Sequence, residues 1–265
     1  MPNIIDFHTH IFPDKIAQKA TQSISNFYTA PMFTVGSLEA LIQTGNGAGI
    51  NRFVVQSVAT TPAQVQSINN FISESAGAHR GEIIGLGAMH PDFEDIEGEI
   101  ERIISLGLKG VKLHPDFQKF NIDDPRAMKI YEAMEGRLIL LVHTGDYRTD
   151  YSHPRRLANV LNAFPKLDAV GAHFGGWSVW DDAIKYLLDK RCWVDTSSTF
   201  NFIEDVKRQR ELVKIWGAER LLFGTDFPMA NHTEELERLH TATAELSSED
   251  IEKILYKNAE KLLKL

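Results

Sequence analysis

Short apolar runs recur along the chain, and segments with helical periodicity separate them. Runs rich in Val, Ile, Leu and Phe predict strands over residues 3–8, 51–58, 83–89, 108–114, 138–143, 168–173, 191–197 and 220–226. Successive runs start 48, 32, 25, 30, 30, 23 and 29 residues apart, close to the roughly 30 residues that one strand and its crossover helix occupy. Because parallel strands need long crossovers, this spacing predicts an α/β architecture with parallel strands.

The intervening segments carry the signals of amphipathic helices. Helices are predicted over residues 37–48, 92–107, 125–136 and 154–164. Pro125 and Pro154 suit the first turn of two of these helices, and Ser247 or Ser248 can cap a further helix near the C-terminus. The long first crossover, residues 11–49, is expected to be an elaborated loop that ends in the first of these helices.

Eight strand–helix units of similar length favour closure into a (β/α)₈ TIM barrel over an open, doubly wound sheet. Such barrels typically have roughly 250 residues, and this chain has 265. No Gly/Ser linker, low-complexity tract or abrupt shift in charge divides it. We therefore expect residues 1–265 to form a single domain with a C-terminal helix.

The composition is that of an acidic globular protein. Hydrophobic residues make up 43% of the chain and charged residues 24%, which excludes a disordered or collagen-like chain. Lys plus Arg number 28 and Asp plus Glu number 36, so the net charge is −8, and nucleic acid and anionic membranes are poor electrostatic partners. No apolar run approaches the roughly 20 residues of a transmembrane helix.

The cysteine content and the first residues bear on location. Cys192 is the single cysteine, so no intrachain disulfide can form. The first residues lack the basic start and the apolar stretch of a secretory signal. A cytoplasmic location is expected, with a small-molecule substrate and a homodimer as the expected partners.

Histidines and one aspartate fall at the ends of the predicted strands. His8 and His10 form an H-x-H pair in the first strand segment, and His143, His173 and Asp226 end the fifth, sixth and eighth. In parallel α/β folds the functional groups gather at these C-terminal ends. A buried ionisable side chain is costly unless it is paired or bound to metal. Five such residues at strand ends predict shared metal coordination rather than separate, satisfied core residues.

The ordered set H-T-H, H, A-H-F-G-G and G-T-D-F-P resembles the amidohydrolase superfamily, and most of all its amidohydrolase-2 branch, which includes aminocarboxymuconate-semialdehyde decarboxylase. This resemblance implies that His8, His10, His143 and Asp226 are metal ligands and that His173 lies beside a metal-bound water. Three imidazoles and one carboxylate suit Zn²⁺, although other divalent first-row metals bind similar sites.

The fourth strand bears on the number of metal ions. Some superfamily members hold two metals through a carboxylated lysine at this place, and here the strand reads G-V-K-L-H-P. Lys112 could be carboxylated, or its ammonium could face a substrate anion, so one ion is favoured and a binuclear centre is the alternative. His114 shares a face with Lys112 and could line the substrate site. Arg148 could clamp a substrate carboxylate, and Trp177 could wall the pocket.

Three functions are consistent with this site. A divalent ion lowers the pKa of bound water toward about 7. Asp226 could then move the proton of the attacking water while His173 orients that water or stabilises charge, so hydrolysis of a small amide, ester or lactone is favoured. The alternative is non-oxidative decarboxylation of a small unsaturated or aromatic acid. A metal-binding barrel without catalysis is the third, less favoured interpretation.

Overall fold

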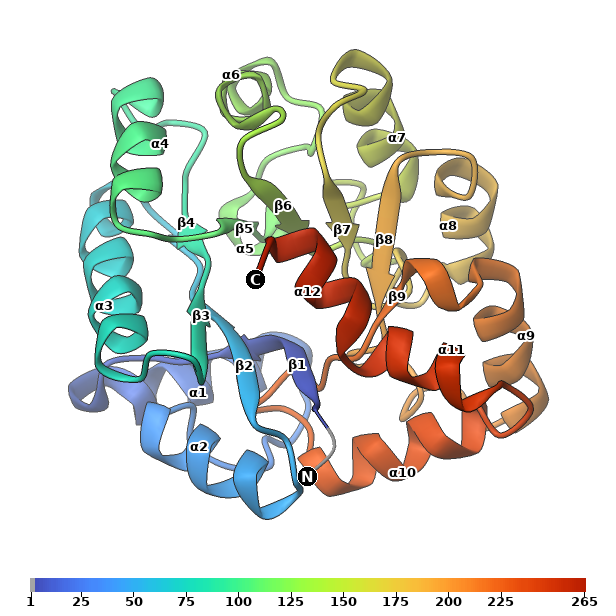
Figure 1. Cartoon of the computed structure of the whole chain (residues 1–265). Coiled ribbons are helices and arrows are strands. Elements are labelled where there is room, and N and C mark those ends of the chain that lie inside the picture. Colours follow the sequence, from blue (N-terminus) through green and yellow to red (C-terminus); the bar gives the residue numbers. More distant parts are fainter. Residues whose placement is uncertain (1–2) are drawn as a thin grey trace.

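A ring of parallel strands forms the centre of the molecule (Figure 1). The computed structural model describes residues 3–265. The strands form one sheet in the order β1-β2-β3 and a second in the order β4-β5-β6-β7-β8-β9, with parallel pairing throughout. Their bounds are β1 Ile5–His10, β2 Arg52–Gln56, β3 Ile83–Gly85, β4 Gly87–Ala88, β5 Gly110–Leu113, β6 Ile139–Val142, β7 Ala169–Gly171, β8 Cys192–Asp195 and β9 Leu221–Leu222.

Backbone contacts at both junctions between the two sheets close the ring. Only Leu86 separates β3 from β4, and its N–H donates to the carbonyl of Val55 at 2.9 Å, so β3 and β4 together form the strand predicted over 83–89. At the other junction Thr9 of β1 forms a parallel bridge with Phe227, beyond the end of β9. The chain therefore folds as the predicted (β/α)₈ TIM barrel.

Helices surround the ring of strands (Figure 1). They are α1 Asp14–Tyr28, α2 Leu38–Gly47, α3 Val65–Ala78, α4 Ile96–Ser105, α5 Pro115–Gln118, α6 Pro125–Met134, α7 Pro154–Ala163, α8 Trp180–Leu187, α9 Val206–Trp216, α10 His232–Ala242, α11 Ser248–Glu252 and α12 Asn258–Leu263, with 3₁₀ segments at Pro62–Gln64 and Ala218–Arg220 and a π segment at Lys253–Lys257. Helices α2, α4, α6 and α7 lie where the sequence predicts them. Ser247 caps α11, because its Oγ accepts the N–H of Asp250 at 3.1 Å.

The prediction of a loop for the first part of the long crossover is wrong, because this part contains helix α1. The helix has 15 residues, of which only Ala17 and Thr21 are buried. Ala17, Ala20, Ile24 and Phe27 nevertheless recur at helical spacing, so the sequence carries a sign of this helix that the loop prediction missed. Thr29 ends α1 in the left-handed conformation, with φ of 53°, and leaves Tyr28 at the last helical position.

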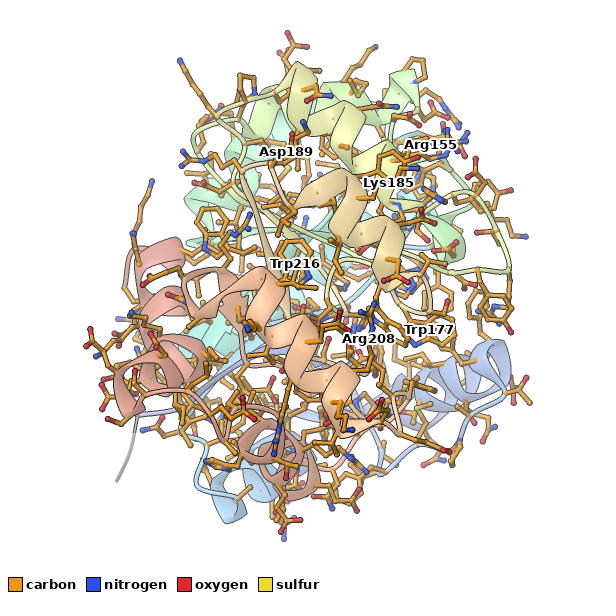
Figure 2. All side chains as sticks on the ribbon, turned by 90° about the vertical axis from the view of Figure 1, so that its right-hand side faces the viewer. Arg155, Trp177, Lys185, Asp189, Arg208 and Trp216 are labelled. Atoms are coloured by element: carbon orange, nitrogen blue, oxygen red, sulfur yellow. The ribbon has the colours of Figure 1, made fainter. Side chains whose placement is uncertain are left out.

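Apolar packing covers one end of the barrel, and the candidate site lies at the other end. Leu262 and Leu263 of α12 pack in one cluster with inward-facing residues such as Ile5 and Ile139, which begin their strands. Helix α12 thus covers the opening at the N-terminal ends of the strands (Figure 1). Trp177 lies on the opposite side of the molecule, near α1 (Figure 2). No helix within residues 3–265 is long and apolar enough to span a bilayer.

Candidate metal centre

Five predicted site residues lie at the C-terminal ends of four strands. His8 and His10 belong to β1, His143 follows β6, His173 follows β7, and Asp226 lies beyond β9. His173 and Asp226 adopt left-handed backbone conformations with φ of 61° and 66°. For residues with a side chain such conformations cost about 1–3 kcal/mol, and they are enriched at functional sites. Tight turns therefore aim these two side chains into the barrel mouth.

His8, His10 and Asp226 bring three potential ligand atoms together. The Nε2 atoms of His8 and His10 are 3.2 Å apart. Oδ1 of Asp226 lies 3.5 Å from Nε2 of His8 and 3.3 Å from Nε2 of His10. Two imidazole nitrogens and one carboxylate oxygen form a donor set that suits a divalent transition metal, so these residues fit the ion that the sequence predicts.

A buried carboxylate holds the ring of His8. Asp195, at the end of β8, has no exposed surface, and its Oδ2 lies 2.9 Å from Nδ1 of His8. Oδ1 of the same carboxylate accepts the backbone N–H of His173 at 3.0 Å and that of Ser197 at 3.2 Å. A carboxylate at Nδ1 of a histidine keeps the hydrogen there and leaves Nε2 free to bind a metal.

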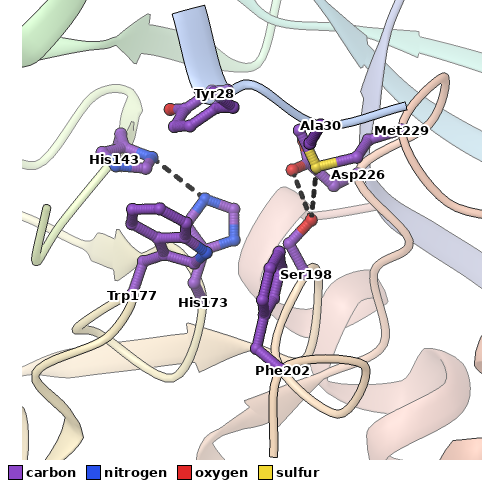
Figure 3. A pocket seen from close by; sticks show the side chains of 9 residues that line it. All are labelled: Tyr28, Ala30, His143, His173, Trp177, Ser198, Phe202, Asp226 and Met229. Carbon is purple, nitrogen blue, oxygen red and sulfur yellow. Dashed lines mark hydrogen bonds between the residues drawn. The ribbon is translucent and has the colours of Figure 1, made fainter. Parts of the chain in front are cut away.

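Ser198 holds the carboxylate of Asp226 in a similar way. Its hydroxyl donates to Oδ2 of Asp226 at 2.7 Å, as Figure 3 shows. Ser198 is 1% exposed and has a φ of 42°, so a strained turn supports this contact. With Oδ2 engaged by Ser198, Oδ1 faces the two imidazoles.

His143, the fourth predicted ligand, lies one imidazole away from this cluster. Its Nδ1 is 3.0 Å from Nε2 of His173 (Figure 3). The ring of His173 in turn stacks on His8 with centroids 5.2 Å apart. Nδ1 of His173 lies 2.9 Å from the carbonyl of Ser197 and must carry a hydrogen there, so Nε2 faces the centre. The four-ligand set therefore remains a prediction, with three members in place and His143 beside them.

Lys112 reaches the cluster from β5. Its Nζ is 3.0 Å from Nε2 of His8, and its side chain is buried. Burial lowers the pKa of Lys112 to about 8, against the opposing influence of Asp226 and Asp195. Lys112 therefore lies among the candidate metal ligands, deeper than the pocket side chains that would meet a substrate.

The electrostatics of the centre favour neutral imidazoles and an ionised carboxylate. Burial lowers the pKa values of His8, His10 and His143 below their ordinary range. For Asp226, burial acts to raise the pKa, but the hydrogen bond with His10 and the nearby imidazoles hold it well below the ordinary range. Metal ligands must be deprotonated, and at neutral pH these side chains meet that condition.

A pocket is lined by Asp226 and His143 of these residues and by His173 (Figure 3). It is lined by Tyr28, Ala30, His143, His173, Trp177, Ser198, Phe202, Asp226 and Met229. Trp177 contacts Tyr28 on one side and Phe202 on the other, with ring centroids 5.4 and 5.7 Å apart. The pocket therefore has aromatic walls beside a polar side formed by imidazoles and a carboxylate.

Of the four predicted substrate residues, Trp177 lines this pocket, whereas Lys112, His114 and Arg148 do not. His114 stacks on His143 with centroids 4.1 Å apart, and its Nε2 lies 2.7 Å from the hydroxyl of Tyr28. Arg148 donates to both carboxylate oxygens of Asp146, through Nε at 2.9 Å and Nη2 at 2.6 Å. Its guanidinium is engaged inside the fold, so it is not available as a clamp for a substrate carboxylate.

Several residues of the site are absent from the sequence-based set. They are Tyr28, Asp116, Asp195, Ser198 and Phe202. Asp195 could have been predicted from the sequence. It ends the apolar strand C-W-V-D in the same way as Asp226 ends the apolar run that precedes it. Tyr28 ends helix α1, which the sequence-based prediction missed, and Ser198 and Phe202 lie beyond β8 in a turn without a distinctive motif.

Comparisons with known proteins agree with this geometry. A family model described as amidohydrolase matches residues 5–265. A 2-amino-3-carboxymuconate-6-semialdehyde decarboxylase from Caenorhabditis elegans is 29% identical over 126 residues, which cover 40% of this chain and 30% of that protein. The chain thus spans about a third of the length of the curated relatives that it matches.

Solved structures share the whole fold. An uncharacterized TIM-barrel protein from Bordetella bronchiseptica has a TM-score of 0.79 at 22% identity, covering 99% of this chain and 98% of that one. A dihydroxybenzoic acid decarboxylase from Polaromonas sp. JS666, solved with manganese and the inhibitor 2-nitroresorcinol, has a TM-score of 0.76 at 16% identity, covering 100% and 98% of the two chains. At these identities the likeness establishes the barrel.

Proposed function

Because the chain belongs to the amidohydrolase family, we propose that it is a metal-dependent decarboxylase that removes CO₂ from a small aromatic or unsaturated acid. The observation that carries this proposal is a pocket with aromatic walls that is lined by Asp226, one of the three residues of the cluster of His8, His10 and Asp226. The relatives and solved structures that bear decarboxylase names support the same choice.

The lining of the pocket suits this substrate class. Tyr28, Trp177 and Phe202 offer flat apolar surface on which a planar ring can stack. No lysine or arginine is among the nine residues of the pocket lining, so the substrate's carboxylate must face the metal centre to be neutralised. The departing CO₂ is uncharged, and it leaves through apolar surroundings without a cost in solvation.

A bound divalent cation, held by His8, His10 and Asp226, would supply the positive charge that orients the carboxylate and an adjacent oxygen of the substrate. Zn²⁺ and Mn²⁺ both suit this donor set. The presence of manganese in the dihydroxybenzoic acid decarboxylase makes Mn²⁺ the first ion to test. We propose one ion per chain, held by His8, His10 and Asp226, since the two other possible ligand groups include Asp195 and Asp146, whose carboxylates are already engaged by His8 and Arg148.

Asp226 is the proposed proton carrier. Decarboxylation breaks the bond between the ring carbon and the carboxylate, and the electron pair stays on that carbon, which must gain a proton. Asp226 is ionised at rest, so it first takes a proton from a substrate hydroxyl or from water and then delivers it to the carbon. His173 lines the same pocket and would hold a substrate oxygen through this transfer.

The test compares decarboxylation with hydrolysis in one preparation. Protein loaded with Mn²⁺ or Zn²⁺ is given a panel of hydroxybenzoic and unsaturated acids, and CO₂ release is measured. In D₂O, one deuterium should appear at the carbon that loses CO₂. Asp226→Asn with metal bound is the control, and it should release CO₂ at least about 100-fold more slowly.

Hydrolysis of a small amide, ester or lactone is the second candidate. It is favoured by Asp226 and His173 lining one pocket, where a water could lie between an ionised carboxylate and an imidazole. Metal-dependent cleavage of chromogenic esters or lactones without CO₂ release would replace the decarboxylase proposal. Stoichiometric metal without either activity would favour a non-catalytic barrel.

A further inference from the structure

Asp116 lies outside the pocket, behind the predicted ligand His143. It is the second residue of α5 and follows the end of β5 in the sequence L-H-P-D. Its side chain and that of His143 are 1% and 3% exposed. Oδ2 of Asp116 and Nε2 of His143 are both buried without a hydrogen-bond partner among the residues that the structure describes. These two atoms lie 3.8 Å apart.

Each of these two atoms is the suitable partner of the other. The second carboxylate nearby belongs to Asp146, and both of its oxygens already accept hydrogen bonds from Arg148. On the far side of the imidazole, Nδ1 of His143 faces Nε2 of His173 at 3.0 Å. Because Nδ1 of His173 carries a hydrogen, Nε2 of that ring can accept one from Nδ1 of His143 while no metal is bound. When a metal takes Nδ1 of His143, the hydrogen of that ring lies on Nε2 and points toward Asp116, where an acceptor oxygen is free.

Both side chains are held so that a small shift is enough to form the contact. The hydroxyl of Thr149, from the loop after β6, donates to Oδ1 of Asp116, which leaves Oδ2 for His143. The ring of His143 is stacked on His114 with an interplanar angle of 10°, which restricts its rotation. Closing the gap from 3.8 Å to the roughly 2.9 Å of a hydrogen bond needs a shift of about 1 Å.

We propose that Asp116 is a positioning residue for the metal centre: it accepts the Nε2 hydrogen of His143 and so presents the bare Nδ1 of that ring to the centre. Asp195 does the same for His8 with the opposite nitrogen, since it contacts Nδ1 and leaves Nε2 free. Carboxylates that orient metal-binding imidazoles fix the tautomer in this way. The inference rests on the proposed metal centre, so it is tested with metal bound.

The direct test is the tautomer of His143, read by long-range ¹H–¹⁵N correlation spectra of histidine-labelled protein. A His143→Gln spectrum assigns the signal. In wild type with Zn²⁺ bound, the hydrogen should be found on Nε2 and Nδ1 should be bare. In Asp116→Ala with Zn²⁺ the signal should shift toward a mixture of tautomers, and Asp116→Asn should partly restore the wild-type pattern because its amide oxygen can still accept the hydrogen. A hydrogen on Nδ1 in Zn²⁺-loaded wild type, or no change in Asp116→Ala, would overturn the proposal.

The second test is metal affinity, measured by competition with a chromophoric chelator. Loss of an orienting partner typically costs 10–100-fold in affinity, and we expect a loss of that size for Asp116→Ala and a smaller one for Asp116→Asn. Thr149→Val is the matched control, because it removes the loop tether of Asp116 but leaves the contact with His143. It should stay within about twofold of wild type. An equal loss in Thr149→Val would assign Asp116 a structural role in the loop and refute the positioning role.

A double-mutant cycle completes the test. In a His143→Ala background, Asp116→Ala should weaken metal binding by less than about twofold, since its partner is gone; independent, additive losses would contradict the proposal. A second equivalent of metal that Asp116→Asn abolishes, with the His143 tautomer unchanged, would make Asp116 a ligand instead. Should Asp116→Ala not fold, Asp116→Asn carries both measurements. A protein that lacks decarboxylase activity but shows the expected tautomer would refute only the proposed function.

Discussion

Replacement of Asp195 by asparagine should weaken metal binding although Asp195 is not a predicted ligand. The substitution keeps the size of a side chain that has no exposed surface. Oδ1 accepts the backbone N–H groups of His173 and Ser197, and the hydroxyl of Ser197 also donates to it. These donors will hold the amide oxygen of asparagine at the same place. The amide nitrogen must then take the position of Oδ2, 2.9 Å from Nδ1 of His8.

The magnitude follows from the tautomer of His8. An amide N–H directed at Nδ1 requires an acceptor there, so the hydrogen of the imidazole moves to Nε2. That nitrogen is the one that faces His10 at 3.2 Å and Asp226 at 3.5 Å, where the metal is expected. The metal must then displace a hydrogen or turn the ring, and losses of 10–100-fold, about 1.4–2.7 kcal/mol, are typical of such outer-shell changes.

The assay is competition for Zn²⁺ or Mn²⁺ with a chromophoric chelator, combined with thermal unfolding of the metal-free proteins. Asp189→Asn is a matched control, because it removes the same charge from an exposed position paired with Lys190. It should leave the dissociation constant unchanged. An Asp195→Asn protein that is folded and binds metal within twofold of wild type would refute the tautomer argument.

Further predictions concern ligands, proton transfer, the pocket and pH. His8→Ala and His10→Ala should each lower bound metal, measured by elemental analysis, and CO₂ release in parallel; activity with an empty site would contradict this. Asp226→Asn should keep part of the metal but lose at least about 100-fold in turnover, the usual contribution of a proton carrier, and near-full turnover would refute its role. Trp177→Ala should raise KM by about tenfold with little change in kcat, in line with the loss of an aromatic stacking partner; a steady-state rate analysis checks the split. Because burial lowers the pKa values of His8, His10 and His143, protons should compete with the metal only at more acidic pH. The affinity should then change little between pH 7.5 and 6.5, whereas three imidazoles with the ordinary pKa of about 6.5 would lose about sixfold.

The strand ends could be predicted from the sequence, and with them most of the centre. Parallel strands are buried on both faces, so their apolar runs are long enough to recognise, and a polar residue that ends such a run lies at the functional edge of the barrel. This reasoning located His8, His10, His173 and Asp226. It applies equally to Asp195, which ends the run of β8.

The loops could not be predicted in the same way, because their contacts are set by packing between distant segments. Helix α1 has an apolar period at Ala17, Ala20 and Ile24, but nothing in that period indicates that the helix brings Tyr28 into the pocket. Arg148 lies at the predicted mouth of the barrel, but Asp146 two residues earlier takes its guanidinium. The sequence shows that a charged side chain lies near the site, but the direction of that side chain depends on its nearest hydrogen-bonding partner.

Lys112 and His114 illustrate where the alternation rule stops. Two residues apart on an extended chain share a face, and both side chains were expected near the substrate. Lys112 lies within β5, where the rule holds, and its Nζ reaches the candidate ligand His8. His114 lies just beyond the strand and is already the N-cap of α5, with a φ of −135° and a ψ of 85°. The turn into that helix directs its ring against His143 and the hydroxyl of Tyr28. The alternation rule therefore assigns side chains to a face only up to the last residue of a strand, and the residues that line the pocket lie beyond that point.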